Sequence, residues 1–525
     1  GSEMCIRDRI NLYMTHNATN NKRIAQNTIL LYFRMLFMMV VSLYTSRVIL
    51  SILGVEDFGI YNVVGGIVGL FSFLNGSMST ATQRYLTFEI GMDNIQNLRK
   101  VFSLCITIHF IIALIIFILA ETIGLWLLTT QMNIPPERVD AAMWVYQLSI
   151  FTCIILIMSV PYNADIIAHE KMGTFAYISI FEVTTKLLIV YLLNYINYDK
   201  LKVYAILMFC IQCIIRVIYG IYCKRHFIET QYKFIWDSKL IKEMFGFAGW
   251  NMFGIIASIG ITQGINILLN MFFSPIVNAA RGIAVQVQNA ITGFSANFQL
   301  ALSPQITKSY AQHEIKQMHK LIFASSKYSF LLLYFLSLPL LIETCQVLQW
   351  WLKEVPDHTI NFVRIMLCIS MVNVMADSFM VASQATGKIR TYQILVGGAL
   401  LFIVPTAYIA LKLGYPPESV FFTHLLYAIL AQIIRVYLVR KLVHFSIFNY
   451  IKNVVIRIIA VALLSLILPL FCYFSMNISF IRFLIVGITA VLSVIISTYF
   501  IGLEKTERNF IKTQIQNKLY RGKKL

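Results

Sequence analysis

Long apolar runs separated by short polar connections recur along the whole chain. A membrane-spanning helix needs about 20 predominantly apolar residues, and about fourteen runs approach that length. We therefore predict an all-α polytopic membrane protein with about 14 transmembrane helices. The span near Ala290 is the least apolar, because Gln and Asn side chains interrupt it. The predicted spans are centred near Met38, Val68, Ile115, Ile154, Ile189, Ile211, Ile259, Ala290, Leu333, Met371, Leu401, Leu430, Leu464 and Val491.

The second half of the chain repeats the pattern of the first. Residues 245–310 resemble residues 24–85, each with two apolar helices, a short turn and a closing Gln, basic residue and Tyr. A second match pairs residues 168–172 with 384–388. Because six spans return the chain to its starting side, we predict two parallel six-helix lobes followed by two further helices. Parallel repeats place a transport pathway at the lobe interface.

The predicted spans also divide the chain into segments. The opening GSEMCIRDR resembles an added leader, so we expect Met14 to be a native start. We predict a leader and N-terminal segment at 1–23, an N-lobe at 24–223, a linker at 224–243, a C-lobe at 244–441, two helices at 442–502 and a basic tail at 503–525.

Composition supports the membrane class. The 525 residues are 58% hydrophobic and 13% charged, with a mean hydropathy of +0.73, which lies outside the soluble range. The net charge of +19 comes from basic residues in alternate connections, which indicates the positive-inside rule rather than nucleic-acid binding. Both termini are predicted to be cytoplasmic. The opposite connections carry only Arg138, Lys200, Lys202, Lys353 and Lys412.

Three stretches carry a family resemblance. They are LGVEDFGIYNVVGGIVGLFSFLNGSMSTATQRYLTFEIG, PYNADIIAHEKMGTFAYISIFEVTTK and SQATGKIRTYQ. The chain closely resembles bacterial polysaccharide flippases of the Wzx type over nearly all of residues 24–502. Those proteins belong to the MOP exporter superfamily, with MATE drug exporters and lipid II flippases.

The resemblance implies a location, a substrate and partners. It implies a bacterial cytoplasmic (inner) membrane protein that flips undecaprenyl-pyrophosphate-linked oligosaccharide to the outer leaflet, for O-antigen, capsule or exopolysaccharide. Expected partners are this substrate, membrane lipids, a polysaccharide polymerase, glycosyltransferases, and H⁺ or Na⁺. No cofactor or metal is expected, since the nine cysteines show no metal-ligand spacing.

Carrying a pyrophosphate across hydrocarbon requires cations inside the spans. A charge at bilayer depth costs roughly 2.5 kcal/mol or more, so a buried Arg or Lys marks a candidate functional site. Each candidate also has a structural alternative: snorkelling, capping or interface anchoring, and for Lys186 an ion pair with Glu182 four residues earlier. The predicted anion-site residues are Arg34, Lys186, Arg216, Arg47, Arg281 and Arg364.

Intramembrane acids are the candidates for ion coupling. Asp165, Glu182 and Asp377 could each bind a proton or Na⁺, as could His109 and His424, or each could be a satisfied interior residue. A MATE-like cation-coupled exporter of small molecules is an alternative function. It would favour an acid in the first span, which instead carries Arg34 and no Asp or Glu.

A polysaccharide polymerase or glycosyltransferase is a further alternative. Such an enzyme would need a catalytic outer loop, and the predicted outer connections are short. The sequence contains no GxxxxGK[ST] phosphate loop, so ATP is not expected to be the direct driver. We therefore expect a transporter rather than an enzyme.

Overall fold

The computed structural model confirms the predicted all-α class. Its described residues are almost wholly helical and contain no strand. They are 26–42, 44–45, 48–49, 51–54, 57–58, 60–61, 64–65, 72–130, 135–273, 275–352, 355–504 and 507–509.

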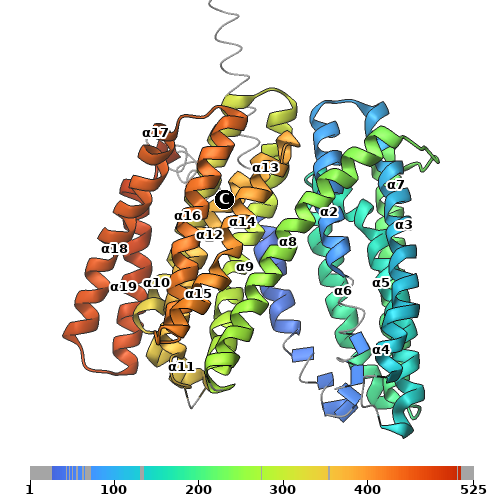
Figure 1. The fold of residues 1–525 in the computed structure, drawn as a ribbon, viewed down its shortest axis with the longest axis horizontal. Coiled ribbons are helices and arrows are strands. Elements are labelled where there is room, and N and C mark those ends of the chain that lie inside the picture. The colour runs from blue at the N-terminus through green and yellow to red at the C-terminus, as the bar shows by residue number, and fades with distance from the viewer. Residues whose placement is uncertain are drawn as a thin grey trace, which may run out of the picture. The chain divides into compact units, whose positions relative to one another are not determined.

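The helices follow one another through short connections (Figure 1). After the apolar helix Gln26–Ser42 come α2 (Ser72–Gly91), α3 (Ile95–Leu119), α4 (Leu125–Thr130), α5 (Val139–Ala168), α6 (Met172–Leu192), α7 (Lys200–His226), α8 (Ser238–Phe272) and α9 (Pro275–Ala311). Then come α10 (Ile315–Ile342), α11 (Thr344–Leu352), α12 (Thr359–Thr386), α13 (Arg390–Tyr392), α14 (Gly398–Leu401), α15 (Ile403–Lys412), α16 (Glu418–Val443), α17 (Ile447–Tyr450), α18 (Ile456–Ser475) and α19 (Phe480–Ser497).

Eleven helical stretches among the described residues are long and apolar enough to cross a membrane. The protein is therefore a multi-pass membrane protein. The predicted span near Met38 falls on the shorter helix Gln26–Ser42, and the span near Ala290 falls on α9. The span predicted near Val68 lies largely outside the described residues.

The chain divides into two compact units, and the divisions fall inside α8, α9, α12 and α13 and after the first residue of α10. The predicted lobe boundaries at 24–223 and 244–441 stay predictions. The first unit comprises Gly1–Ile256, Leu300–Ile315 and Gln384–Arg390. The second comprises Ala257–Gln299, Lys316–Ser383 and Thr391–Leu525.

Helix α5 is the centre of the first unit. It packs against α7, α2, α3 and α6. Tyr146 of α5 is fully buried, and its hydroxyl donates a hydrogen bond to the carbonyl oxygen of Ala120 at 2.6 Å. A buried hydroxyl without a partner would cost roughly 1 to 3 kcal/mol. This hydrogen bond therefore allows the Tyr146 hydroxyl to be buried among apolar helices.

Helix ends in this unit follow local sequence signals. The Asn94 side chain accepts a hydrogen bond from the Asn97 amide and caps α3. Asp199 caps α7 in the same way. Helix α7 ends with the cations at residues 224–226, whose charge is favourable beside the carboxyl end of a helix dipole.

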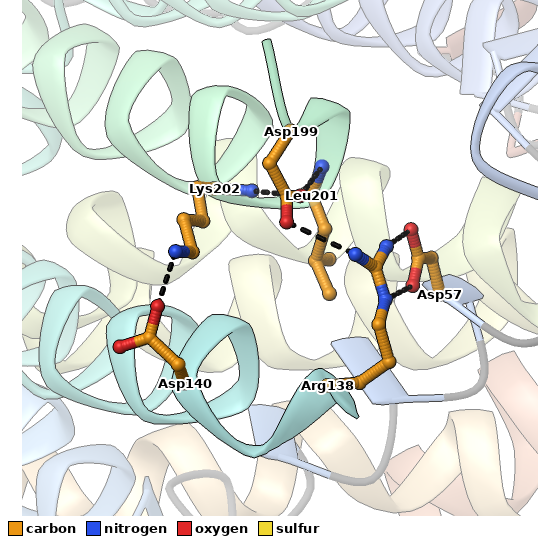
Figure 2. A network of polar contacts seen from close by, with 6 residues as sticks. All are labelled: Asp57, Arg138, Asp140, Asp199, Leu201 and Lys202. Atoms are coloured by element: carbon orange, nitrogen blue, oxygen red, sulfur yellow. Dashed lines mark hydrogen bonds and ion pairs between the residues drawn. The ribbon is translucent and has the colours of Figure 1, made fainter. Parts of the chain in front are cut away.

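Arg138 ties together three segments at the end of the first unit that the charge pattern predicts to be outside (Figure 2). Its Nε donates to Asp57 Oδ1 at 2.8 Å, and its Nη1 donates to Asp199 Oδ2 at 3.0 Å. A second bond to Asp57 makes that contact bidentate. Lys202 pairs with Asp140 nearby. Asp57 belongs to the first of the three resemblance motifs. Through Arg138, it connects that motif to the starts of α5 and α7.

The second unit is built around an apolar core. Helix α18 packs against α19, and α15 packs against α16. The rings of Phe362 and Phe421 lie 4.6 Å apart between centroids. Arg482 Nη2 and Glu343 Oε2 form an ion pair of 2.9 Å, and both side chains are buried. This pair links the start of α19 to the end of α10.

Candidate functional site

Arg34 lies in the middle of helix Gln26–Ser42 and points toward α6. Its guanidinium carbon lies 4.4 Å from the ring centroid of Phe175, and its Nη1 donates a long hydrogen bond of 3.5 Å to Ser179 Oγ. Its Nε is buried and has no hydrogen-bond partner in the structure. No acid within the described residues forms an ion pair with it. Arg34 therefore presents a half-buried cation whose hydrogen-bonding capacity is only partly used.

Arg216 of α7 is a second cation of this kind. Its guanidinium carbon lies 4.0 Å from the ring centroid of Tyr162 on α5, a favourable cation–π geometry. Tyr219, one turn further along α7, interacts electrostatically with Arg34. Arg34 therefore lies close to the turn of α7 that follows Arg216.

Lys186 is in a different state. Its Nζ lies 2.6 Å from Glu182 Oε1, so the two residues form the ion pair that their spacing predicts. Gln212 of α7 donates to the same carboxylate oxygen at 3.0 Å. Glu182 is therefore held by two partners, and the charge of Lys186 is already balanced. Both residues of the pair lie on α6, the helix that Arg34 contacts through Phe175 and Ser179.

The candidate cations of the second unit contact helix backbones. Arg281 donates to the carbonyl oxygen of Thr262 at 2.9 Å and to the side chain of Asn266 at 3.2 Å, which connects α9 to α8. Arg364 of α12 donates to the carbonyl oxygen of Leu341 at 3.1 Å. This carbonyl at the end of α10 also accepts a hydrogen bond from Thr344 Oγ1 at 3.2 Å. Arg281 and Arg364 belong to the second unit, whereas Arg34 belongs to the first. Arg47 lies outside the described residues.

The remaining coupling candidates have nearby polar or charged groups. Asp377 of α12 interacts electrostatically with Arg435 of α16. His109 is fully buried, and its Nδ1 lies 2.8 Å from the carbonyl oxygen of Cys105. His424 is close enough to Arg281 to interact electrostatically with it. Each residue therefore has a structural contact inside its own unit.

Arg84 connects two of the resemblance motifs. Its Nε and Nη2 donate to the carbonyl oxygens of Gln384 and Ala385 at 3.0 and 3.1 Å, so it caps α12. Gly387 follows with a φ of +75°, and a Cβ there would lie 2.9 Å from Arg84 Nη2. The turn therefore needs glycine for both its backbone conformation and its space.

Glu170 makes the corresponding contact from the turn of the first repeat to the closing motif of the second. Its carboxylate accepts hydrogen bonds from Lys308 Nζ at 2.7 Å and from Gln305 Nε2 at 2.5 Å. Its backbone carbonyl accepts one from Asn27. The closing motif of each sequence repeat thus binds the turn of the other repeat. The repeat itself was visible in the sequence, but nothing in the sequence indicated this exchange of partners.

Asp165 lies in an acidic cluster at the end of α5. It is fully buried, with His169 and Glu229 beside it. Glu229 lies in a short 3₁₀ turn, Ile228–Thr230, after α7. Burial raises its pKa, but hydrogen bonds from His169 and its own backbone amide, with the charge of His169, lower it overall. Sequence reasoning did not identify Glu229, because it lies 60 residues from His169.

No protein-family model matches the sequence, and no curated protein sequence matches it either. Solved structures do resemble the fold. An outward-facing multidrug resistance MATE family transporter of the MOP superfamily is 12% identical, with a TM-score of 0.69 over 81% of this chain and 96% of that chain. MATE in the bent conformation has a TM-score of 0.70 at 12% identity, over the same shares of the two chains.

A third similar structure is a MOP superfamily transporter from Pyrococcus furiosus. It is described as having a binding pocket of reverse polarity that suggests a different function. Its TM-score is 0.65 at 13% identity, over 81% of this chain and 96% of that chain. The chain therefore has the fold of MATE and MOP transporters, as the resemblance implied.

Proposed function

We propose that this protein is a transporter of the bacterial cytoplasmic membrane that flips undecaprenyl-pyrophosphate-linked polysaccharide repeat units to the outer leaflet. The observation that carries the proposal is Arg34, a half-buried cation in an apolar helix with a buried, unpartnered Nε and no acid paired with it among the described residues. An anionic substrate would supply the missing partner. A buried, unpaired cation is otherwise costly.

The pyrophosphate is the part of the substrate that this site would hold. Arg34 interacts electrostatically with Tyr219 of α7, three residues after Arg216, and arginine binds phosphate oxygens through two parallel N–H groups. Lys186 would contribute once an anion competes with Glu182 for it. Arg281, Arg364 and Arg47 belong to the proposal as residues near the outer ends of the spans that receive or release the head group.

Transport by alternating access would require the contacts at the predicted cytoplasmic helix ends to open. Arg84 with residues 384–387, and Glu170 with Lys308, hold α2, α9 and the turns beside them together. H⁺ or Na⁺ binding at Asp165, Glu182 or Asp377 is the proposed coupling step. A polysaccharide polymerase and glycosyltransferases would be the partners that use and supply the substrate.

A MATE-like exporter of small molecules is the second candidate function. The observation that favours it is the fold shared with a multidrug resistance MATE family transporter. A cationic drug would not be attracted to the arginines on Gln26–Ser42 and α7. For that reason we place the lipid-linked anion first.

A leaflet assay separates the two candidates. The purified protein is reconstituted in liposomes with a fluorescent undecaprenyl-pyrophosphate oligosaccharide, and outside-accessible lipid is measured beside efflux of a cationic dye. We expect protein-dependent flipping that falls about tenfold or more in Arg34→Ala, since a charge-assisted contact contributes roughly 1.5 to 3 kcal/mol. Arg34→Lys should fall less, because it keeps the charge.

The control is Lys412→Ala, which also removes one positive charge, but from an exposed position on α15. It should flip lipid like the unmodified protein. Normal flipping by Arg34→Ala at equal reconstituted amounts would refute the anion site. Dye efflux without lipid movement would establish the small-molecule exporter instead.

A further inference from the structure

Three side chains of metal-ligand type converge where α5 ends in the first unit. Asp165 lies in the last turn of α5, His169 caps that helix, and Glu229 lies in the turn after α7. The His169 Nε2 atom lies 2.6 Å from Glu229 Oε1 and 3.8 Å from Asp165 Oδ1. One ligand atom from each residue lies within 4.8 Å of the other two. The cluster is therefore compact enough for a single ion.

The state of Asp165 distinguishes this cluster from an ordinary ion pair. Its side chain is 0% exposed, and neither carboxylate oxygen accepts a hydrogen bond from an N–H or hydroxyl donor among the described residues. Glu229 beside it is also buried. His169 is the basic side chain that lies beside both carboxylates. Two buried carboxylates side by side either share a proton or bind a cation. A bound cation would satisfy both.

The geometry around His169 is fixed before any ion binds. Its ring stacks on Phe227, with centroids 4.2 Å apart and 9° between the planes. The following residue, Glu170, has a φ of +59°, and the turn is closed by a hydrogen bond from the Lys171 amide to the carbonyl oxygen of Ile166. The stacked ring and the closed turn therefore hold the Nε2 atom of His169 toward the two carboxylates.

One imidazole nitrogen and two carboxylate oxygens form a set of three protein ligands typical of zinc sites that keep an open fourth position. At metal–ligand distances of about 2.0 to 2.2 Å, tetrahedral ligand atoms lie about 3.4 Å apart. The distance from His169 Nε2 to Asp165 Oδ1 is close to this value. The distance from His169 Nε2 to Glu229 Oε1 would have to increase by less than about 1 Å when an ion binds. We propose that Asp165, His169 and Glu229 bind one divalent transition-metal ion, with Zn²⁺ as the best-matched probe.

A cavity beside the cluster gives an ion a route to the site. It has a volume of about 310 Å³ and is lined by His169 and Glu229 together with Glu89, Asp93 and His226. Water in this cavity can fill the fourth coordination position. A bound ion would tie the end of α5 to the segment after α7. A metal ion held by Asp165 would leave Glu182 and Asp377 as the residues for H⁺ or Na⁺ coupling.

Metal binding to the purified full chain in detergent tests the site directly. The protein is stripped with a chelator, incubated with Zn²⁺, freed of excess metal and analysed for metal per chain, with affinity measured against a chromophoric chelator. We expect about one zinc ion per chain. Asp165→Asn, His169→Gln and Glu229→Gln should each weaken binding by more than the roughly 10- to 100-fold cost of losing an outer-shell partner.

Matched controls come from the same cavity. His226→Gln and Glu89→Gln alter a histidine and an acid that line it but do not belong to the three ligands. Both should bind zinc like the unmodified protein. Failure of the unmodified protein to retain zinc, or equal binding by the three ligand variants, would overturn the proposal. The test on the unmodified protein needs no variant, so a negative result there cannot be explained by a misfolded variant.

Discussion

At the scale of single residues, the state of each intramembrane charge depends on its partners. Arg34 and Lys186 are both cations within apolar helices, yet Lys186 pairs with Glu182 at 2.6 Å, whereas Arg34 stacks on Phe175 and has a buried, unpartnered Nε. Removing the charge of Lys186 would leave Glu182 without its ion-pair partner. Removing Arg34 would lose a cation–π contact and a long hydrogen bond to Ser179. Their effects on transport and on stability should therefore differ.

Gly387 gives a prediction at this scale. Gly387→Ala should lower stability more than Gly414→Ala, although both residues have a positive φ, of +75° and +85°. Each replacement adds a left-handed strain of about 1 to 2 kcal/mol. At Gly387 the new methyl group would also displace Arg84, which lies 2.9 Å away, whereas nothing lies within 4 Å at Gly414. Melting temperatures in detergent compare the two.

Equal losses in the two variants would show that backbone strain alone matters at Gly387. In that case the cap that Arg84 places on α12 would tolerate displacement.

At the scale of helices, the sequence predicted most spans correctly, because apolar length is a local property that needs no knowledge of partners. The pattern also marked the span near Ala290 as interrupted by polar residues, and α9, which contains it, is not among the eleven stretches apolar enough to cross a membrane. Contacts such as Arg84 with Gln384 could not be predicted, since the two residues are 300 positions apart. For the same reason Glu229 escaped notice beside Asp165. Charges inside helices can be found from sequence, but their partners require the fold.

The two ion-pair groups in Figure 2 should contribute unequally to the free energy of unfolding. Arg138→Gln should lower the free energy of unfolding by about 2 kcal/mol, because it breaks charge-assisted bonds and strands Asp57 and Asp199. Lys202→Met should cost about 1 kcal/mol or less, since its partner Asp140 has a side chain that is 73% exposed. Chemical denaturation in detergent, with both variants beside the unmodified protein, measures the difference. A cost for Lys202→Met as large as that for Arg138→Gln would contradict this ranking.

At the scale of the whole molecule, the repeat in the sequence corresponds to a reciprocal set of contacts. The motif that closes residues 24–85 holds the turn at residues 384–387, and the motif at residues 305–310 holds the turn at Glu170. Both sets lie at the helix ends that the charge pattern predicts to be cytoplasmic. If transport opens this end, both sets must separate in each cycle.

A cross-link across these contacts tests that requirement. A Cβ built at Gly91 lies 2.8 Å from the Cβ of Ala311, so the ends of α2 and α9 touch there. A disulfide spans about 3.8 Å between Cβ atoms, so the double variant Gly91→Cys with Ala311→Cys needs a shift of about 1 Å. We expect oxidation of this pair to stop flipping in the leaflet assay, and reduction to restore it. Each single variant, oxidised in the same way, controls for the native cysteines. Full flipping by the completely cross-linked protein would mean that α2 and α9 stay together throughout transport, and that any opening occurs elsewhere.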